Sequence, residues 1–230
     1  MMQPKIIAII PCAGNGSRFA SNIPKQYHKI GNLSVLHHTL NKFMAIDIIS
    51  AVYIVSQTGD EYCAAYADLS PKIKILSVDS TSRAMSVKKA LEQINLDHDD
   101  WVLVHDAVRC CVESKTIIKL IEQLYNDAVG GILATPVTDT LKQLDKKQQI
   151  TATLDRSLIY LAQTPQMFRY KILKQALLSC DLNKITDESS GVELLGYHSK
   201  IVLGEVSNIK ITTPGDLQLA RFLLEQQNCN

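Results

Sequence analysis

Short apolar runs alternate along this chain with segments whose apolar residues recur at helical spacing. Five of the runs are typical of strands buried on both faces, at residues 6–10, 51–56, 73–78, 101–105 and 131–137. The apolar residues within 35–44, 87–94 and 117–124 recur at helical spacing. Such alternation predicts an α/β fold, with a mostly parallel sheet and helices on both of its faces.

Two helix starts can be predicted from single residues. Ser114 precedes a helical pattern and is a suitable N-cap, because a serine hydroxyl can accept a hydrogen bond from an early backbone N–H group. Near the end of the chain, Pro214 suits a first helical turn and Asp216 suits the positive end of a helix. We therefore expect one helix to begin at each of these points.

A polar stretch interrupts the alternation. Residues 139–159, DTLKQLDKKQQITATLDRSLI, have strand-like flanks around an Asp-Lys-Lys sequence at 145–147. This pattern predicts a β-hairpin in place of a crossover helix. Such a hairpin leaving a compact domain either packs on a partner subunit or remains a solvated surface feature, and the pattern alone favours neither.

The composition excludes several classes of protein. The 230 residues suit one large domain, and 46% of them are apolar, which is enough for a sizeable core. The formal net charge is +1, so no global field would gather nucleic acid or an anionic membrane. No apolar run reaches about 18 residues, and the N-terminus has no signal-peptide pattern. We predict a soluble cytoplasmic protein with no nucleic-acid or membrane partner.

The six cysteines are scattered and include no CxxC pair. This spacing favours reduced cysteines that serve as small apolar residues over disulfides or a metal centre. Cys12 is a special case, because it lies near cations and a helix start. It is either a thiol of lowered pKa or an unreactive spacer.

A glycine-containing turn follows the first predicted strand, in the stretch IIPCAGNGSRFASNIPKQY at residues 9–27. Exposed N–H groups in such a turn can cradle phosphate. The turn lacks the third glycine of GxGxxG and the lysine of GxxxxGK[ST], so it is neither a dinucleotide fingerprint nor a P-loop. Arg18 and Lys25 beside the turn suit a reaction in which pyrophosphate leaves a nucleoside triphosphate. The alternative is a tight turn with two surface cations.

Further motifs, in order along the chain, resemble those of a known family. They are RAMSV at 83–87, VHDAVR at 104–109, PVTDTLK at 136–142, LDRS at 154–157, QTPQMF at 163–168, TDESSGVELLG at 186–196 and NIKITTPGDL at 208–217. Together with the first turn, they resemble the 2-C-methyl-D-erythritol 4-phosphate cytidylyltransferases of the non-mevalonate isoprenoid pathway. The resemblance covers almost the whole chain.

This resemblance implies a Rossmann-like fold with a protruding β-arm for dimerisation. It implies one nucleotidyltransferase domain over residues 1–230, in which 138–160 form a dimerisation and substrate-binding arm. The implied reaction joins CTP to the phosphate of 2-C-methyl-D-erythritol 4-phosphate and releases pyrophosphate, in a homodimer that uses Mg²⁺. Two alternatives are a transferase for another polyol phosphate, such as ribitol 5-phosphate, and a nucleotide-binding regulatory module without turnover.

The resemblance also assigns roles to residues. Catalytic cations would be Arg18, Lys25 and Lys210, and the magnesium ligand would be Asp106. Nucleotide contacts would come from Cys12, Ala13, Gly14, Gly16, Ser86 and Ala107. The polyol phosphate would be bound by Arg109, Thr140 and Arg156. The nucleophile is already a phosphate anion, so no general base is needed and His105 is expected to turn away from the site or support it.

The chain departs from the family pattern in three places, which are the segment after Asp106, where a proline is missing, Cys12, where relatives have alanine, and residues 79–82. Where relatives have a glycine-rich stretch that contacts the base, residues 79–82 here read Asp-Ser-Thr-Ser. The contacts to the base are therefore not assigned from this segment.

Overall fold

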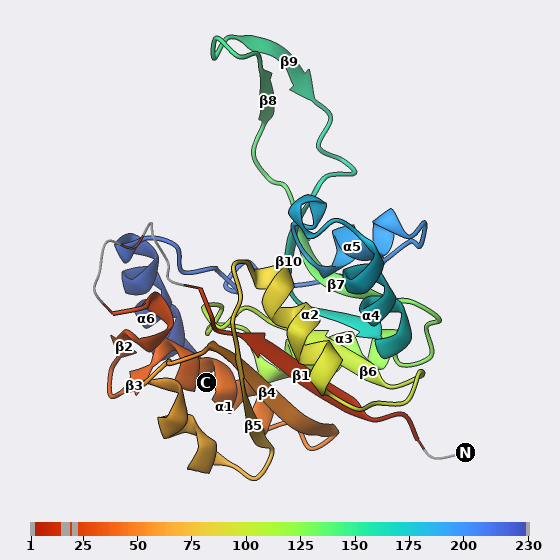
Figure 1. Cartoon of the computed structure of the whole chain (residues 1–230). Helices are drawn as coiled ribbons and strands as arrows, with labels where there is room; N and C mark the ends of the chain where they lie inside the picture. The colour runs from red at the N-terminus through yellow and green to blue at the C-terminus, as the bar shows by residue number, and fades with distance from the viewer. Residues whose placement is uncertain (1–2, 15–18, 20–22, 229–230) are drawn as a thin grey trace.

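A seven-stranded sheet forms the centre of the computed structural model, which describes residues 3–14, 19 and 23–228 (Figure 1). The strand order is β11-β7-β10-β6-β1-β4-β5. The strands are β1 (Ile6–Pro11), β4 (Ile49–Gln57), β5 (Ile73–Val78), β6 (Trp101–Val104), β7 (Gly130–Pro136), β10 (Tyr160–Arg169) and β11 (Lys200–Leu203). Only β10 runs antiparallel to its neighbours in this sheet, so the predicted α/β fold with a mostly parallel sheet is confirmed.

Helices cover both faces of the sheet. They are α1 (Val35–Met44), α2 (Arg83–Gln93), α3 (Ser114–Leu124), α4 (Tyr170–Ser179), α5 (Glu188–Leu194) and α6 (Pro214–Asn228). Ile6 and Ala8 of β1 pack in one buried cluster with residues of α1 and α3. Ile7 and Ile9 pack in the other with residues of α2, α4 and α5. Successive side chains of a strand point to opposite faces, so the apolar run of β1 serves two cores.

The two predicted helix starts have different outcomes. Pro214 begins α6 as expected, and Asp216 accepts hydrogen bonds from the backbone N–H groups of Thr212 and Thr213. The prediction that Ser114 caps α3 is wrong, because Glu113 is the N-cap and Ser114 is already helical. The Ser114 hydroxyl donates instead to the carbonyl of Lys42, which ties α3 to α1.

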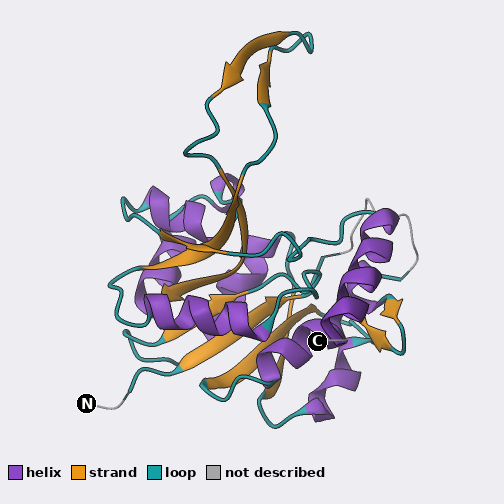
Figure 2. Cartoon of the chain, turned by 180° about the vertical axis from the view of Figure 1, so that it is seen from behind, coloured by secondary structure: helices purple, strands orange, loops and turns teal. Residues whose placement is uncertain are grey.

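A hairpin projects from the body between β7 and β10 (Figures 1 and 2). It consists of β8 (Leu141–Leu144) and β9 (Ile150–Leu154), paired antiparallel in a sheet of their own. The predicted hairpin is therefore confirmed. Its apolar residues are largely exposed, including Ile150 at 63%. The dimerising role of this arm stays a prediction.

Short elements complete the described fold. They are the two-stranded pair β2 (Lys29–Ile30) and β3 (Leu33–Ser34), and the 3-10 turns η2 (Lys25–Tyr27), η3 (Cys63–Leu69) and η4 (Leu182–Lys184). Among the described helices, none has the length and apolar character needed to cross a membrane.

The topology brings several loops together. Strands β5, β4, β1 and β6 are parallel neighbours, so the loops after their carboxyl ends share one edge of the sheet. The loop after β1, the segment before α2 and the segment 105–109 all lie there. Open parallel sheets bind ligands at this edge.

Candidate active site

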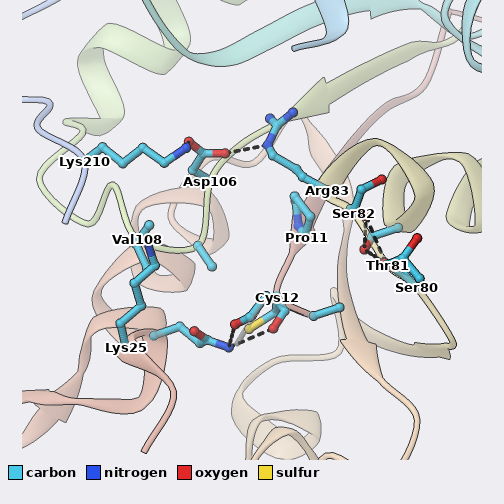
Figure 3. Close-up of a pocket in the computed structure, with 15 residues that line it drawn as sticks. Pro11, Cys12, Lys25, Ser80, Thr81, Ser82, Arg83, Asp106, Val108 and Lys210 are labelled. Carbon is cyan, nitrogen blue, oxygen red and sulfur yellow. Dashed lines mark hydrogen bonds and ion pairs between the residues drawn. The ribbon is translucent and has the colours of Figure 1, made fainter. Parts of the chain in front are cut away.

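A cavity of about 540 Å³ lies beyond the carboxyl ends of β1, β5 and β6 (Figure 3). Segments from distant parts of the chain line it. The lining residues are Pro11, Cys12, Ala13, Gly14, Lys25, Gln26, Ser80, Thr81, Ser82, Arg83, Ser86, Asp106, Ala107, Val108 and Lys210. The cavity therefore brings together Lys25, Lys210, Asp106, Ser86 and several predicted loop residues.

Asp106 is the acidic residue among those that line the cavity, and cations surround it. Its Oδ1 lies 2.6 Å from Arg83 Nε, and its Oδ2 lies 2.8 Å from Lys210 Nζ. Arg109 Nε is 3.5 Å from Oδ2. Burial would raise the pKa of Asp106, but these cations outweigh it and hold the pKa well below its usual range. Asp106 is thus a carboxylate at neutral pH.

Hydrogen bonds around His105 hold Asp106 in place. The backbone N–H of Asp106 donates to Thr164 Oγ1 at 3.1 Å, and Thr164 Oγ1 lies 3.0 Å from His105 Nδ1. His105 Nε2 lies 3.2 Å from the carbonyl oxygen of Arg109. Burial lowers the pKa of His105 to about 3, so the imidazole is neutral. A neutral ring that accepts at Nδ1 and donates from Nε2 satisfies both contacts, and His105 supports the site as expected.

The side chain of Gln26 in η2 holds the loop after β1 through two hydrogen bonds. Gln26 Nε2 donates to the carbonyl of Cys12 at 2.8 Å and to that of Gly14 at 3.4 Å. The Cys12 thiol is buried and lies 3.6 Å from the Tyr27 hydroxyl. Burial raises the pKa of this thiol well above its usual range, which contradicts a reactive thiolate and supports the unreactive spacer. The predicted residues Gly16 and Arg18 lie outside the described part of the chain.

Lys25 and Lys210 reach the cavity from opposite ends of the sequence. Lys25 follows the first loop, and its Nζ donates to the carbonyl of Ile211 at 3.1 Å. Lys210 lies next to Ile211 and contacts Asp106. Figure 3 shows Lys25 on the far side of the cavity from Asp106. Two lysine side chains therefore line opposite parts of this space.

Hydroxyl groups form another wall of the cavity. Ser80, Thr81 and Ser82 precede α2, and Ser82 Oγ caps this helix by accepting from the N–H of Met85. Ser86 is buried, and its Oγ lies 2.6 Å from Ser80 Oγ. The segment whose contacts were not assigned from the sequence thus lines the cavity beside the predicted Ser86.

Three residues predicted to bind the polyol phosphate do not line the cavity of this chain. Arg109 Nη1 donates to the carbonyl of Asn208 at 2.7 Å. Thr140 is exposed at the base of the arm, and exposed Arg156 donates to the carbonyl of Thr138. The substrate contacts of all three stay predictions.

The sequence reading assigned no role to Arg83, Gln26, Thr164 or Glu188. Arg83 lies one helical turn before Ser86 on α2, so its placement follows from the RAMSV motif once Ser86 is put in the site. Gln26 follows Lys25 directly. The places of Thr164 and Glu188 depend on contacts across more than 55 residues, which no local pattern indicates.

A mostly parallel sheet with a cationic cavity beyond the ends of its strands, one carboxylate on the cavity wall and a wall of hydroxyl groups is typical of enzymes that bind nucleotides. Comparison with known proteins narrows this class. A family model described as 2-C-methyl-D-erythritol 4-phosphate cytidylyltransferase matches residues 6–226. The chain belongs to this family.

Individual relatives are similar over nearly their full length. A 2-C-methyl-D-erythritol 4-phosphate cytidylyltransferase of Chromobacterium violaceum is 44% identical, over 95% of this chain and 97% of the relative. A crystal structure of a 4-diphosphocytidyl-2C-methyl-D-erythritol synthase has a TM-score of 0.85 at 37% identity, covering 97% of this chain and all of the other. The Francisella tularensis cytidylyltransferase has a TM-score of 0.79 at 36% identity, with coverages of 95% and 99%.

Proposed function

We propose that this enzyme transfers the cytidylyl group of CTP to 2-C-methyl-D-erythritol 4-phosphate in isoprenoid biosynthesis. The family match over residues 6–226 carries the proposal. In the reaction, a phosphate oxygen of the acceptor attacks the α-phosphorus of CTP. The bond from that phosphorus to the β-phosphate oxygen breaks in line with the attack. The products are 4-diphosphocytidyl-2-C-methyl-D-erythritol and pyrophosphate.

Charge neutralisation is the chief requirement of this reaction, because both reactants are anions. Lys25 and Lys210 line the cavity and would stabilise the charge that develops at the α-phosphate and on the leaving pyrophosphate. Arg18 is proposed to join them. The acceptor phosphate is already ionised, so no general base is required, in agreement with the buried, neutral His105.

The base and the phosphate chain would occupy different parts of the cavity. The hydroxyl wall at Ser80 and Ser86 suits the cytosine, and the loop after β1 suits the phosphates through the backbone N–H groups of Ala13 and Gly14. The N–H of Cys12 donates to the carbonyl of Val55, so Cys12 would border the nucleotide without donating to it from its backbone. Gly16 is proposed to extend this loop. Ala107, which follows Asp106, would border the nucleotide.

The residues present fit a magnesium ion that takes most of its ligands from the phosphates of the substrate and one from the protein. No group of three potential protein ligands occurs in the described ranges, and Asp106 is the carboxylate on the cavity wall. Mg²⁺ is commonly bound by one or two carboxylates together with substrate phosphates. When bound, it would neutralise the triphosphate and orient its oxygens. Asp106 could accept it once Lys210 shifts from Oδ2 towards a phosphate.

The arm is proposed to complete the site of a second subunit. We propose that residues 1–230 form one nucleotidyltransferase domain, in which 138–160 are the dimerisation and substrate-binding arm. Exposed apolar residues on and beside the hairpin, such as Ile150 and Leu158, support a homodimer. Thr140 and Arg156 would then bind the polyol phosphate in the partner's cavity, while Arg109 would bind it within its own chain. We expect the dimer to act in the cytoplasm.

A panel of acceptors tests the proposal. Pyrophosphate release with CTP and Mg²⁺ is measured for 2-C-methyl-D-erythritol 4-phosphate, ribitol 5-phosphate and other polyol phosphates. We expect the highest kcat/KM with the methylerythritol compound. A higher kcat/KM with ribitol 5-phosphate would assign the alternative acceptor. Tight CTP binding without turnover on any acceptor would support a regulatory module.

A further inference from the structure

Glu188 is a carboxylate with no exposed surface, and it lies outside the cavity wall. It is the first residue of α5, and its Oε1 lies 2.7 Å from Arg83 Nη1. Its Oε2 has no hydrogen-bond partner in the described ranges. Burial raises the pKa of Glu188, and the charge and hydrogen bond of Arg83 oppose this shift. The pairing with Arg83 is therefore what favours the anion at this position.

Arg83 is shared between two carboxylates. Its Nη1 faces Glu188 while its Nε, 2.6 Å from Asp106 Oδ1, faces the cavity. The planar guanidinium can hold both groups in a fixed geometry, which an ammonium cannot do. Glu188 therefore restrains the side chain that restrains Asp106.

Of the three cations on Asp106, Arg83 and Lys210 make the shortest contacts, and they differ in how far their side chains are anchored and exposed. Arg83 contacts Oδ1 and is anchored by Glu188, and its side chain is 25% exposed. Lys210 contacts Oδ2 and is 40% exposed. Figure 3 shows the two reaching Asp106 from opposite sides. Lys210 is thus the cation that can leave Asp106 with little rearrangement.

Charge balance gives Glu188 a second effect. Asp106 faces three cations, Arg83, Arg109 and Lys210, and carries one negative charge. Glu188 adds a second negative charge to this group, so its net charge is +1 where it would otherwise be +2. A less positive surrounding makes the approach of a divalent cation to Asp106 less unfavourable.

We propose that Glu188 is a positioning residue that anchors Arg83, so that Lys210 alone is exchanged for the metal–nucleotide complex at Asp106. This inference rests on the proposed function and concerns how the site receives its metal. Glu188 touches neither nucleotide nor metal. It acts through Arg83, across 105 residues of sequence.

Calorimetric titration of CTP into the full-length Glu188→Gln enzyme tests the proposal, once with Mg²⁺ and once with EDTA. Glutamine keeps the size of the side chain and the acceptor for Arg83 but removes the charge. We expect the gain in CTP affinity on adding Mg²⁺ to fall about tenfold, as for other supporting residues of metal sites. CTP affinity in EDTA should be unchanged or stronger, because the cavity has become more positive.

Two further variants sharpen this test. Glu193→Gln makes the same chemical change elsewhere on α5, where Glu193 accepts a hydrogen bond from the Ser189 hydroxyl. It should leave the increase in CTP affinity on adding Mg²⁺ unchanged. Arg83→Lys keeps the positive charge but cannot bridge both carboxylates, so it should reproduce the loss. It provides the test if Glu188→Gln does not fold.

Several outcomes would overturn the inference. The first is a folded Glu188→Gln or Arg83→Lys enzyme in which Mg²⁺ increases CTP affinity as much as in the parent. The second is a variant that binds CTP more weakly to the same extent with and without Mg²⁺. The third is a parent enzyme whose CTP affinity does not respond to Mg²⁺. Because binding is measured without turnover, the inference can be judged even if the acceptor panel rejects the proposed reaction.

Discussion

The cavity and the arm of this enzyme differ in how their functional side chains are held. In the cavity, Asp106 is 5% exposed and contacts three cations, and Gln26 supports the loop after β1. In the arm, Thr140 and Arg156 are exposed, and the hairpin pairs only within itself in the described structure. A two-stranded hairpin is marginally stable on its own. The side chains of the cavity are thus held in place by contacts within the chain, whereas Thr140 and Arg156 of the arm lie on an exposed hairpin.

Asp106→Asn should have the largest effect on activity. The change keeps the shape of the side chain but removes the charge, leaving three cations without their carboxylate. We expect kcat to fall by about 1000-fold, the upper end for loss of one preorganised electrostatic group, with weak rescue by excess Mg²⁺ at best. Steady-state kinetics over a magnesium series provide the measurement.

Thermal unfolding must accompany that measurement, because removing one partner of a buried ion pair can cost about 3–5 kcal/mol. Asp127→Asn is a matched control, since Asp127 pairs with Lys200 away from the cavity. An Asp106→Asn enzyme with unchanged magnesium dependence would show that the metal is held elsewhere.

Lys25→Ala and Lys210→Ala should each lower kcat by about 100-fold, because each removes one contact that strengthens in the transition state. Both side chains line the cavity, so the fold should be retained. Lys119→Ala removes a lysine that contacts the carbonyl of Leu203, outside the cavity, and serves as control. Near-normal kcat in either folded variant would remove that lysine from the catalytic set.

The buried His105 should make the stability of the body depend on pH. Its pKa is about 3 in the folded state, below its ordinary value of 6.5, so the unfolded chain binds the proton more tightly. The contribution of His105 to the free energy of unfolding is therefore complete above about pH 6.5. It is lost as the pH falls, by about 1.4 kcal/mol per pH unit. Asp106, whose pKa is also lowered, contributes a loss only below its ordinary value of 3.8.

Chemical unfolding between pH 7 and pH 4.5 measures this slope. His105→Gln should flatten it, even though the variant is less stable at pH 7. If the parent and the variant show the same slope over this range, the titrating group lies elsewhere in the chain.

Arg156→Lys should raise KM for the polyol phosphate about tenfold and leave KM for CTP unchanged. The arginine fork can bind a phosphate through two hydrogen bonds, which lysine cannot match. Lys147→Ala changes a cation in the turn of the same hairpin and should alter neither constant. Equal changes in the two KM values would contradict a specific contact to the acceptor.

Mixed dimers decide whether the arm acts across subunits. An Arg156→Ala chain and a Lys25→Ala chain are each expected to be poorly active alone. If the arm serves the partner's cavity, the mixed dimer has both defects in one site and leaves the other intact, so activity reappears on subunit exchange. A mixture that exchanges subunits but stays inactive would place the arm in its own chain's site.

The smallest effect is expected from an apolar change on the arm. Leu144 is 52% exposed, so Leu144→Ala should change the free energy of unfolding by less than about 0.5 kcal/mol. Leu40→Ala on α1 removes a fully buried side chain of the same type and should cost about 2–5 kcal/mol. A large loss for Leu144→Ala that depends on protein concentration would show that a second subunit covers the arm.

Local sequence patterns were enough for the main elements. The apolar runs predicted β1, β4, β5, β6 and β7 within a few residues. Strands β1 and β6 are buried on both faces and leave continuous apolar stretches, as expected. The expectation of burial on both faces is wrong for β5, because it lies at the edge of the sheet and buries only Ile73 and Val78. The hairpin followed from its alternation around a polar turn. The N-cap of α3 was misplaced by one residue, because serine is a preferred capping residue, whereas Glu113 occupies the cap position without a side-chain capping hydrogen bond.

Local patterns therefore predicted the class of fold, the hairpin and the loops that border the cavity, since strand burial and loop composition act over short distances. Which side chains meet depends on the tertiary packing. The strand order brings Asp106 beside the loop after β1, and helix packing brings Arg83 to Glu188 across 105 residues. Such contacts depend on how elements pack, because neither partner leaves a pattern near the other in the sequence.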